Sequence, residues 1–468
     1  MLFNSLVFLL FFPIFAAAYF GTRGDVRHWV SLIGSYVFYG WWDWRFCVLL
    51  FGLTAVNFWI GARLAAARDD RGRRRWLTAS VVVSLGVLGF FKYLNFFATS
   101  VAAGLASLGL PPQPHLVNVI LPVGISFYTF QTMSYTIDLY RRHIEPEPSL
   151  LRFSVFVAFF PQLVAGPILR ASEFLPQLRI DHVPTLTNAV GGLCLVLWGF
   201  VLKSVMADSL APVVDGRFAN PEAHNALSLA IGLVFYGWQI YGDFAGYSLI
   251  AIGIARMLGF TFPKNFDRPY FAASFSEFWT RWHISLSTWL RDYLYIPLGG
   301  NRRGRLRTYA NLMTTMLLGG LWHGAAWTFV FWGLLHGAYL CLQRLVVAQT
   351  ASIGLAGRML GVPLVFAAVM VAWTFFRAAD FAAATAYLDG IVRGGDWSFA
   401  AVEQKFSVVK GIAIVALVAA LELVSFRIDV WKLAERQPWL YGGFCLACLW
   451  LISIAGTFGN DAFIYFQF

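Results

Sequence analysis

The sequence predicts an all-α polytopic membrane protein, and two features support this prediction. Of the 468 residues, 59% are hydrophobic and 13% are charged, whereas soluble domains usually carry about 25% charged residues. Apolar stretches recur from Leu2 to Ile454 without a long polar interval. A water-soluble fold could not bury this much apolar surface, so we expect a single membrane domain over residues 1–468.

Apolar segments along the chain give the expected positions of the spans. Segments are expected near residues 2–20, 29–42, 46–66, 76–97, 119–138, 150–168, 187–210, 226–258, 308–322, 325–347, 359–376, 407–425 and 439–457. The first segment lacks the basic start and cleavage site of a signal peptide, so we expect it to remain as the first span. The pattern predicts about 11–13 membrane segments, with re-entrant helices among them.

Basic residues predict the orientation of these spans. The net charge is +11, but the positive residues concentrate in short loops, which indicates membrane topology rather than nucleic-acid binding. Loop 68–75 holds five arginines and two aspartates, and the Arg141–Arg142 pair and loop 427–436 are also basic. We expect these three loops in the cytoplasm, with the N-terminus and the tail 458–468 on the outer side.

The five cysteines all lie in apolar segments, where a free cysteine behaves as a small hydrophobic residue. Cys445 and Cys448 have the spacing of a redox or metal-binding pair, but no second ligand pair accompanies them. We therefore expect these cysteines to contribute packing, and we expect no metal.

The hydropathy pattern breaks in the polar and aromatic stretch 264–307. On one continuous helix, one face would carry Trp279, Trp282, Leu286, Trp289, Leu290 and Tyr293, and the opposite face Glu277, Arg281, Thr288 and Asp292. His283 would lie at the edge of the aromatic face. One interpretation is an amphipathic helix at the membrane interface, and the other is a functional segment.

Two further histidines lie in glycine-rich surroundings downstream. His323 lies in the sequence GGLWHG at 319–324, and His336 lies in WGLLHG at 332–337. A neutral imidazole can take a proton from a hydroxyl and return it, which suits acyl transfer near neutral pH. His323 is the leading candidate for a general base, the alternative being a hydrogen bond to a neighbouring helix. For His336 we favour packing.

Several motifs resemble one known family. They are FWTRWHISLS at 278–287, WLRDYLYIPLGGNR at 289–302, LWHG at 321–324, LPVGISFYTFQ at 121–131 and FPQLVAGP at 160–167. Together they resemble the bacterial alginate O-acetyltransferase branch of the membrane-bound O-acyltransferases, over nearly the whole chain. The catalytic block would occupy residues 264–340.

The resemblance implies a fold, a location and roles for particular residues. The fold would be a ring of tilted helices around a central tunnel, in a bacterial inner membrane with both chain ends periplasmic. The family's catalytic histidine matches His323, and His283 matches a second histidine that lines the tunnel. The implied donor is a cytoplasmic thioester, most simply acetyl-CoA.

The donor would be bound by basic and aromatic residues near the tunnel. We assign this role to Arg281, Arg291, Arg302, Trp282 and Trp322, while each arginine could instead contact lipid headgroups. The acetyl group would then move outward for O-acetylation of a glycan.

The aromatic tail 458–468 has two interpretations. It resembles the C-terminal tail of the small partner peptide in teichoic-acid D-alanylation, so Tyr465 would act as an acyl relay. The alternative is anchoring at the outer interface.

The resemblance also implies partners and leaves rival functions open. A periplasmic acetyltransferase of the SGNH type and a polysaccharide synthase or export complex would complete the system, beside membrane lipid. The acceptor could be alginate, cellulose or peptidoglycan. A secondary transporter is the alternative from a different class, because broken helices and histidines at membrane depth also mark transport pathways.

Overall fold

The computed structural model describes residues 1–110, 113–114, 116–164, 166–346, 354–426 and 439–457. Every regular element within these ranges is a helix, as the composition predicts. The chain divides into two compact units. Unit 1 comprises Met1–Ala189 and Ile254–Pro263, and unit 2 comprises Val190–Gly253 and Lys264–Phe468. The expectation of one domain stays a prediction.

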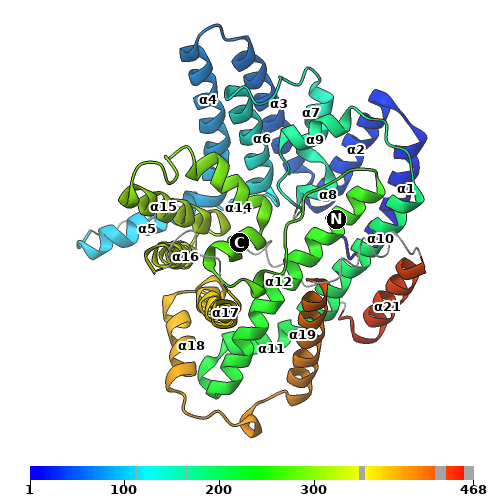
Figure 1. Ribbon diagram of the computed structural model, residues 1–468. Coiled ribbons are helices and arrows are strands. Elements are labelled where there is room, and N and C mark those ends of the chain that lie inside the picture. Colours follow the sequence, from blue (N-terminus) through cyan, green and yellow to red (C-terminus); the bar gives the residue numbers. More distant parts are fainter. Residues whose placement is uncertain (111–112, 115, 165, 347–353, 427–438, 458–468) are drawn as a thin grey trace. The chain divides into compact units, whose positions relative to one another are not determined.

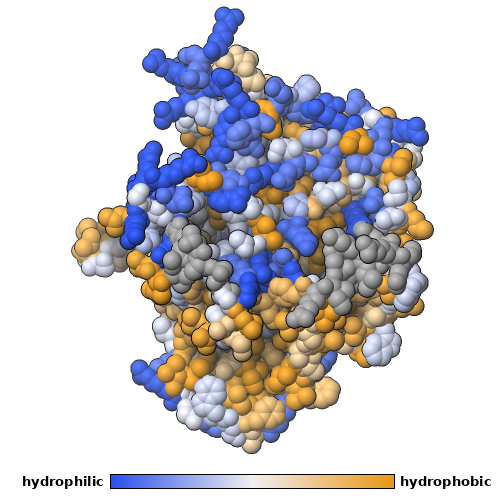
Figure 2. Space-filling model, viewed as in Figure 1, coloured by the Kyte–Doolittle hydropathy of each residue, from blue (hydrophilic) through white to orange (hydrophobic). Residues whose placement is uncertain are grey.

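Six described helical segments are long and apolar enough to cross a membrane, which makes this a multi-pass membrane protein. They are Arg45–Ala66, Asp70–Ser107, Leu186–Ala219, Trp327–Val346, Leu355–Arg377 and Lys405–Ser425, and the shorter apolar helices Leu6–Gly21 and Trp439–Ala455 accompany them. Hydrophobic side chains cover the outer surface around α18 and α19, whereas hydrophilic ones gather where α3 meets α4 (Figure 2). The other expected spans are shorter or more polar helices.

Unit 1 carries the N-terminal helices (Figure 1). They are α1 (Leu6–Gly21), α2 (Gly24–Asp43), α3 (Arg45–Ala66), α4 (Asp70–Leu88), the π-helical turn η1 (Gly89–Tyr93), α5 (Leu94–Ser107), α6 (Ile125–Tyr140), α7 (Leu150–Ala158), α8 (Phe160–Leu163) and α9 (Ala171–Leu178). Buried polar side chains join three of them: the Ser80 hydroxyl donates to Asn57 Oδ1 at 2.6 Å and lies 2.8 Å from the Thr136 hydroxyl. Such contacts hold helices together where water is absent.

The expected span at 150–168 is wrong. The chain forms the two short helices α7 and α8, which part at Phe159, and residues 153–164 are buried in the protein. Pro161 lies in the first turn of α8, where its missing N–H is tolerated, but it cannot continue a helix from α7. The Gly124 turn packs directly on the Leu163 carbonyl, so the motifs 121–131 and 160–167 meet in unit 1.

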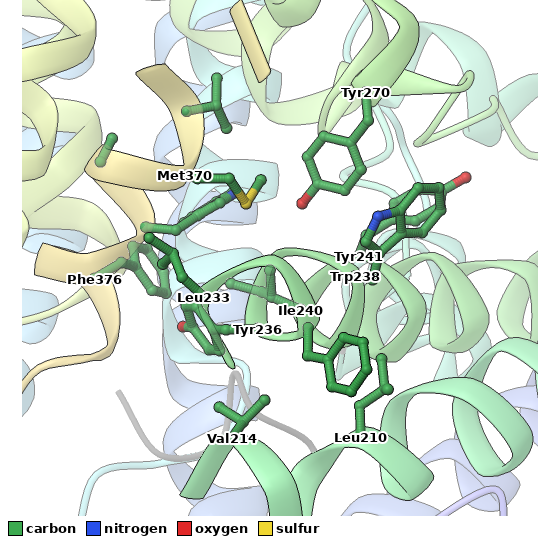
Figure 3. Packing of buried hydrophobic residues seen from close by; sticks show 14 of the residues in the cluster. Leu210, Val214, Leu233, Tyr236, Trp238, Ile240, Tyr241, Tyr270, Met370 and Phe376 are labelled. Atoms are coloured by element: carbon green, nitrogen blue, oxygen red, sulfur yellow. The ribbon is translucent and has the colours of Figure 1, made fainter. Parts of the chain in front are cut away.

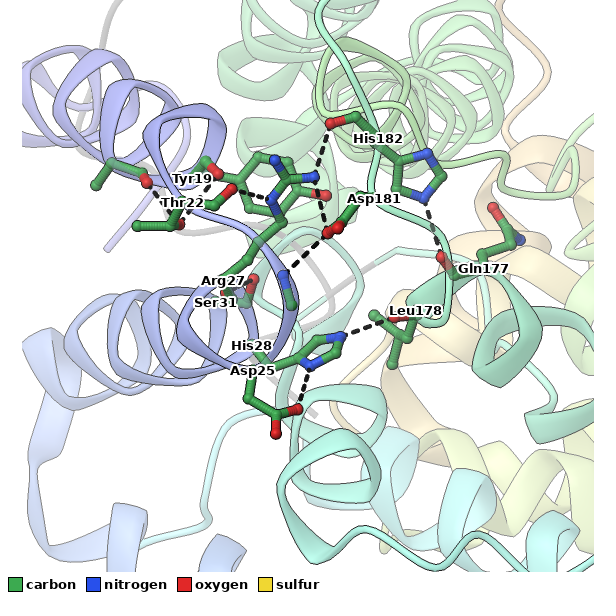
Figure 4. A network of polar contacts seen from close by, with 12 residues as sticks. Tyr19, Thr22, Asp25, Arg27, His28, Ser31, Gln177, Leu178, Asp181 and His182 are labelled. Carbon is green, nitrogen blue, oxygen red and sulfur yellow. Dashed lines mark hydrogen bonds and ion pairs between the residues drawn. The ribbon is translucent and has the colours of Figure 1, made fainter.

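A polar network closes one end of unit 1 (Figure 4). The buried Arg27 guanidinium donates to the carbonyls of Thr22 at 2.8 Å and His182 at 2.7 Å, and it lies 3.6 Å from Asp181. His182 Nε2 in turn lies 3.0 Å from the Gln177 carbonyl. These contacts tie α1 and α2 to the segment that follows α9.

Unit 2 carries the remaining helices, and α10 and α12 connect it to unit 1 along the chain. They are α10 (Leu186–Phe200), the π-helical turn η2 (Val201–Ala207), α11 (Asp208–Ala219), η3 (Pro221–Ala223), α12 (Ala226–Met257), η4 (Pro269–Phe271), α13 (Phe275–Arg281), α14 (Ile284–Leu290), η5 (Arg291–Tyr295), α15 (Arg305–His323), α16 (Trp327–Val346), α17 (Leu355–Arg377), α18 (Phe381–Arg393), η6 (Phe399–Ala401), α19 (Lys405–Ser425) and α21 (Trp439–Ala455).

The core of unit 2 is an aromatic cluster built around α12 (Figure 3). Tyr241 on α12 packs against Tyr270 on η4 with ring centroids 5.6 Å apart, and Met370 on α17 packs against Gly237 of α12. Tyr241, Tyr270 and Met370 are all buried. Aromatic rings bury much apolar surface while offering polar edges. This cluster therefore forms a rigid wall beside the segment that carries the histidines.

Helices α15 and α16 form a close hairpin (Figure 1). A Cβ atom at Gly320 would collide with the Phe329 carbonyl, and one at Gly333 would collide with the Met316 carbonyl. Small residues allow such close backbone approach between membrane helices. The hairpin therefore fixes the end of α15, where His323 is the last helical residue.

Candidate functional site

The stretch 264–307 is not one continuous helix. Helix α13 ends at Arg281 and α14 begins at Ile284, because His283 adopts a left-handed conformation with φ of 42°. A non-glycine residue in this conformation is uncommon, and such backbone strain clusters at functional sites. The break overturns the single amphipathic helix and brings the His283 ring, which is fully buried, into the interior of unit 2.

Asn265 shapes this break, and no sequence pattern pointed to its role. Its backbone carbonyl accepts from the Ile284 N–H at 2.9 Å. Its side-chain Oδ1 accepts from the Ser285 hydroxyl at 2.9 Å, and its Nδ2 donates to the Ser248 hydroxyl on α12, also at 2.9 Å. Asn265 thus connects the start of α14 to α12. It thereby orients His283, which immediately precedes α14.

Helix α13 is anchored on the other side of the break. The Ser274 hydroxyl accepts from the Glu277 N–H at 3.1 Å, and Glu277 Oε2 accepts from the Ala273 N–H at 2.8 Å, which resembles a capping box. Glu277 Oε1 also binds the Arg281 guanidinium at 2.7 Å. Both ends of the short helix are therefore fixed.

His283 and His323 come together in an aromatic enclosure. Their ring centroids lie 6.3 Å apart, although 40 positions separate them in the chain. The ring of Phe244 lies 4.6 Å from His283, and Trp322 lies 5.9 Å from His283 and 5.0 Å from His323. The structure thus joins two of the predicted catalytic residues with Trp322.

The other side of His323 is closed by two rings that the sequence did not single out. Trp332 on α16 and Phe376 on α17 lie 5.1 Å and 5.4 Å from its ring. Trp332 also contacts His336 at 4.6 Å. His336 is fully buried, and neither of its ring nitrogens has a hydrogen-bond partner among the described residues.

Burial determines the charge of His283. The residue lies outside the six apolar spans, and burial among the rings lowers its pKa from 6.5 to about 3. The cause is desolvation, which disfavours the charged imidazolium. His283 is therefore neutral at physiological pH and can offer one N–H donor and one acceptor nitrogen.

The residues assigned to donor binding are distributed more widely. Trp282 is fully buried, and its ring lies 5.0 Å from both Phe266 and Trp373. Arg281 is held by Glu277, as described above, whereas Arg291 lies near the surface with Asp292 at 2.6 Å and Arg302 is exposed. Their role in donor binding stays a prediction, and Tyr465 lies outside the described residues.

The enclosure can carry out acid–base chemistry away from bulk water. Two imidazoles share one apolar space, so one ring can move a proton while the other fixes the reacting group. Among the described residues, no group of three or more histidine, cysteine, aspartate or glutamate side chains is arranged to hold a metal ion.

Comparison with known proteins gives consistent results. Residues 114–383 match the model of the membrane-bound O-acyltransferase family. The chain is 45% identical to the probable alginate O-acetylase AlgI of Azotobacter vinelandii, over 85% of this chain and 79% of the relative. It is 33% identical to the peptidoglycan O-acetyltransferase of Helicobacter pylori, over 84% and 80%. A teichoic acid D-alanyltransferase of Streptococcus thermophilus is 32% identical to this chain, over 47% of this chain and 56% of the relative.

Proposed function

This chain belongs to the membrane-bound O-acyltransferase family, and we propose that it passes acetyl groups from cytoplasmic acetyl-CoA across the membrane for O-acetylation of an exopolysaccharide such as alginate. The observation that carries the proposal is the enclosure around His283 and His323, whose rings lie 6.3 Å apart. Similarity to alginate O-acetylases over most of the chain supports the choice of acceptor.

His323 is the proposed general base. A ring nitrogen of His323 takes the proton of the attacking hydroxyl, whose oxygen forms a bond to the thioester carbonyl carbon. The carbon–sulfur bond then breaks, and the proton passes from His323 to the departing thiolate. Trp332 and Phe376 exclude water from this ring, which limits wasteful hydrolysis of the thioester.

His283 is proposed to position the acyl group. Because its ring is neutral, its N–H can donate to the thioester carbonyl as negative charge develops there. The break between α13 and α14 fixes the ring on one side, and Phe244 packs against it on another. A pre-oriented donor of this kind needs little reorganisation during the reaction.

Arginines are proposed to bind the donor's phosphates. Arg291 and Arg302 lie near the surface, where a guanidinium can form paired hydrogen bonds with phosphate oxygens. Arg281 is engaged by Glu277 at 2.7 Å, so it supports α13 beside Trp282. Binding of lipid headgroups remains the alternative role for the surface arginines.

The relay and the partners complete the proposal. Tyr465 would accept acetyl on its phenolic oxygen and present it on the periplasmic side of a bacterial inner membrane. A periplasmic acetyltransferase of the SGNH type would take the acetyl group and transfer it to the chain delivered by a polysaccharide synthase.

Sealed inverted vesicles test the direction and the chemistry together. Radiolabelled acetyl-CoA outside should release CoA and leave acetyl on the protein or on acceptor inside, and His323→Ala should abolish both signals. Tyr465→Phe should remove both the label on the protein and the label that reaches the inside, and should leave only CoA release by slow hydrolysis. Full activity of His323→Ala, or uptake of acetyl-CoA without cleavage as a transporter would show, contradicts the proposal.

A further inference from the structure

Unit 2 contains a buried ionic triad that the proposed chemistry does not use. Lys203 Nζ on η2 lies 2.7 Å from Asp208 Oδ1 on α11 and 2.6 Å from Asp243 Oδ1 on α12. The three side chains are 7%, 8% and 1% exposed. Ionisable residues inside a membrane protein are costly and usually functional.

The triad stabilises an irregular turn within the spanning segment Leu186–Ala219. It joins the π-helical turn η2 to both α11 and α12, and π-helical turns occur frequently at functional sites. Gly246 on α12 packs against the Gly199 carbonyl just before this turn. The position of η2 against α12 is therefore fixed by close backbone packing and by the triad.

The residues next to the triad bind the end of the described chain. The Thr457 N–H donates to the carbonyl of Ser204, which follows Lys203, at 2.9 Å. The Thr457 hydroxyl lies 3.1 Å from the hydroxyl of Ser209, which follows Asp208. Thr457 is the last residue before the aromatic tail 458–468.

Further polar and apolar contacts hold α21, the helix that leads to Thr457. Lys410 Nζ on α19 donates to the Ala455 carbonyl at 3.4 Å and to the Ser209 hydroxyl at 3.5 Å. Cys448 on α21 packs in a buried cluster with residues of α10 and η2. The end of α21 is thus fixed on η2 and α11 by both polar and apolar contacts.

We propose that Lys203, Asp208 and Asp243 are positioning residues that hold η2 as a dock for Thr457 and thereby place the start of the tail. This inference rests on the proposed relay at Tyr465. Eight residues extend at most about 28 Å, so fixing Thr457 confines the volume that Tyr465 can reach. Confinement of this kind raises the effective concentration of a reacting group.

A cysteine pair reports whether the dock is occupied. In a variant whose five native cysteines are replaced, Ser209→Cys with Thr457→Cys should form a disulfide in high yield with an added thiol oxidant. Lys203→Met should lower the rate of this disulfide formation at least fivefold, because the triad no longer holds η2. The same substitution at the exposed Lys405 should leave it unchanged.

Restoring the dock covalently separates positioning from general stability. In vesicles, Lys203→Met should reduce glycan acetylation about tenfold. When the Ser209→Cys and Thr457→Cys pair is added to Lys203→Met and oxidised, acetylation should return to within about twofold of the oxidised cysteine-pair protein that keeps Lys203. Thr457→Pro removes the N–H that donates to Ser204 and should lower acetylation more than Thr457→Ala, which keeps it. The two Thr457 substitutions therefore test the dock even where Lys203→Met fails to fold.

The outcomes distinguish the dock from the relay. Absence of the disulfide in the parent, equal effects of Thr457→Pro and Thr457→Ala, normal acetylation by Lys203→Met, or a loss that the disulfide does not restore would each overturn the dock. Full acetylation by Tyr465→Phe with normal disulfide formation would reject the relay. His323→Ala should lose acetylation while its disulfide forms at the parental rate.

Discussion

Two histidines of unit 1 are hydrogen-bonded to backbone carbonyls, whereas two histidines of unit 2 are surrounded by aromatic rings. In unit 1, His28 Nε2 lies 2.7 Å from the Leu178 carbonyl and His182 Nε2 lies 3.0 Å from the Gln177 carbonyl, within the network around Arg27 (Figure 4). In unit 2, His283 and His323 are buried among aromatic rings and face each other at 6.3 Å.

This difference separates histidines that stabilise the fold from those available for chemistry. A ring bound to a backbone carbonyl has one nitrogen committed to structure, and its loss should reduce stability. Aromatic walls desolvate a ring and hold it without fixing the direction of proton transfer. The comparison therefore predicts that substitutions in unit 1 affect folding and those in the enclosure affect turnover.

His283→Ala should have the largest effect among the supporting residues of the enclosure. We expect the rate of glycan acetylation to fall about 100-fold, because a pre-oriented donor to the carbonyl is lost. Yield and thermal stability in detergent should stay close to those of the parent. A fall in folded yield that accounts for the whole loss would contradict the role in turnover.

Asn265→Ala should reduce turnover by about tenfold through the orientation of His283. The substitution removes the side-chain contacts to Ser248 and Ser285 and keeps the backbone bond to Ile284. A small misplacement of a catalytic group has kinetic effects of this order. The measurement is kcat at saturating acetyl-CoA, with Gln177→Ala in unit 1 as the matched amide control.

Arg27→Met should destabilise the protein by about 2–3 kcal/mol, since two charge-assisted hydrogen bonds to backbone carbonyls are lost. Activity per folded molecule should remain near the parental value. Unfolding in increasing denaturing detergent gives the stability, and the activity of the surviving fraction gives the comparison. Unchanged stability would mean that the network contributes little.

His182 is expected to make a smaller contribution, to the pH dependence of folding stability. Burial lowers its pKa below the usual 6.5, against the raising effect of the Gln177 carbonyl. The unfolded chain then binds the proton more readily, so stability is fully present above pH 6.5 and decreases as pH falls through the lowered pKa. His182→Gln should flatten this part of the stability profile, and an unchanged slope would contradict the assignment.

The spans were predictable because they depend on composition and length alone. The expected segments 46–66, 359–376 and 407–425 lie within or close to α3, α17 and α19. The broken span at 150–168 was not predictable, because Pro161 acts there through the local chain geometry and an apolar window cannot distinguish one helix from two short buried ones.

The site was predictable only in part. Motifs identified His283 and His323, but the left-handed break at His283 depends on Asn265, which binds α12 and α14 through contacts distant in sequence. Lys203 and Asp243 are 40 residues apart in the chain, and no sequence motif predicted that they form an ion pair. Sequence patterns report local periodicity, whereas these contacts arise from tertiary packing.

The most direct test compares His323→Ala with His182→Ala in purified protein at equal folded concentration. The measured quantities are the rate of CoA release from acetyl-CoA and the rate at which acetyl appears on the protein. We expect His323→Ala to lower both at least 100-fold, and His182→Ala to retain both within about threefold. Equal losses in the two variants, or substantial turnover by His323→Ala, would contradict the assignment of His323 as the base.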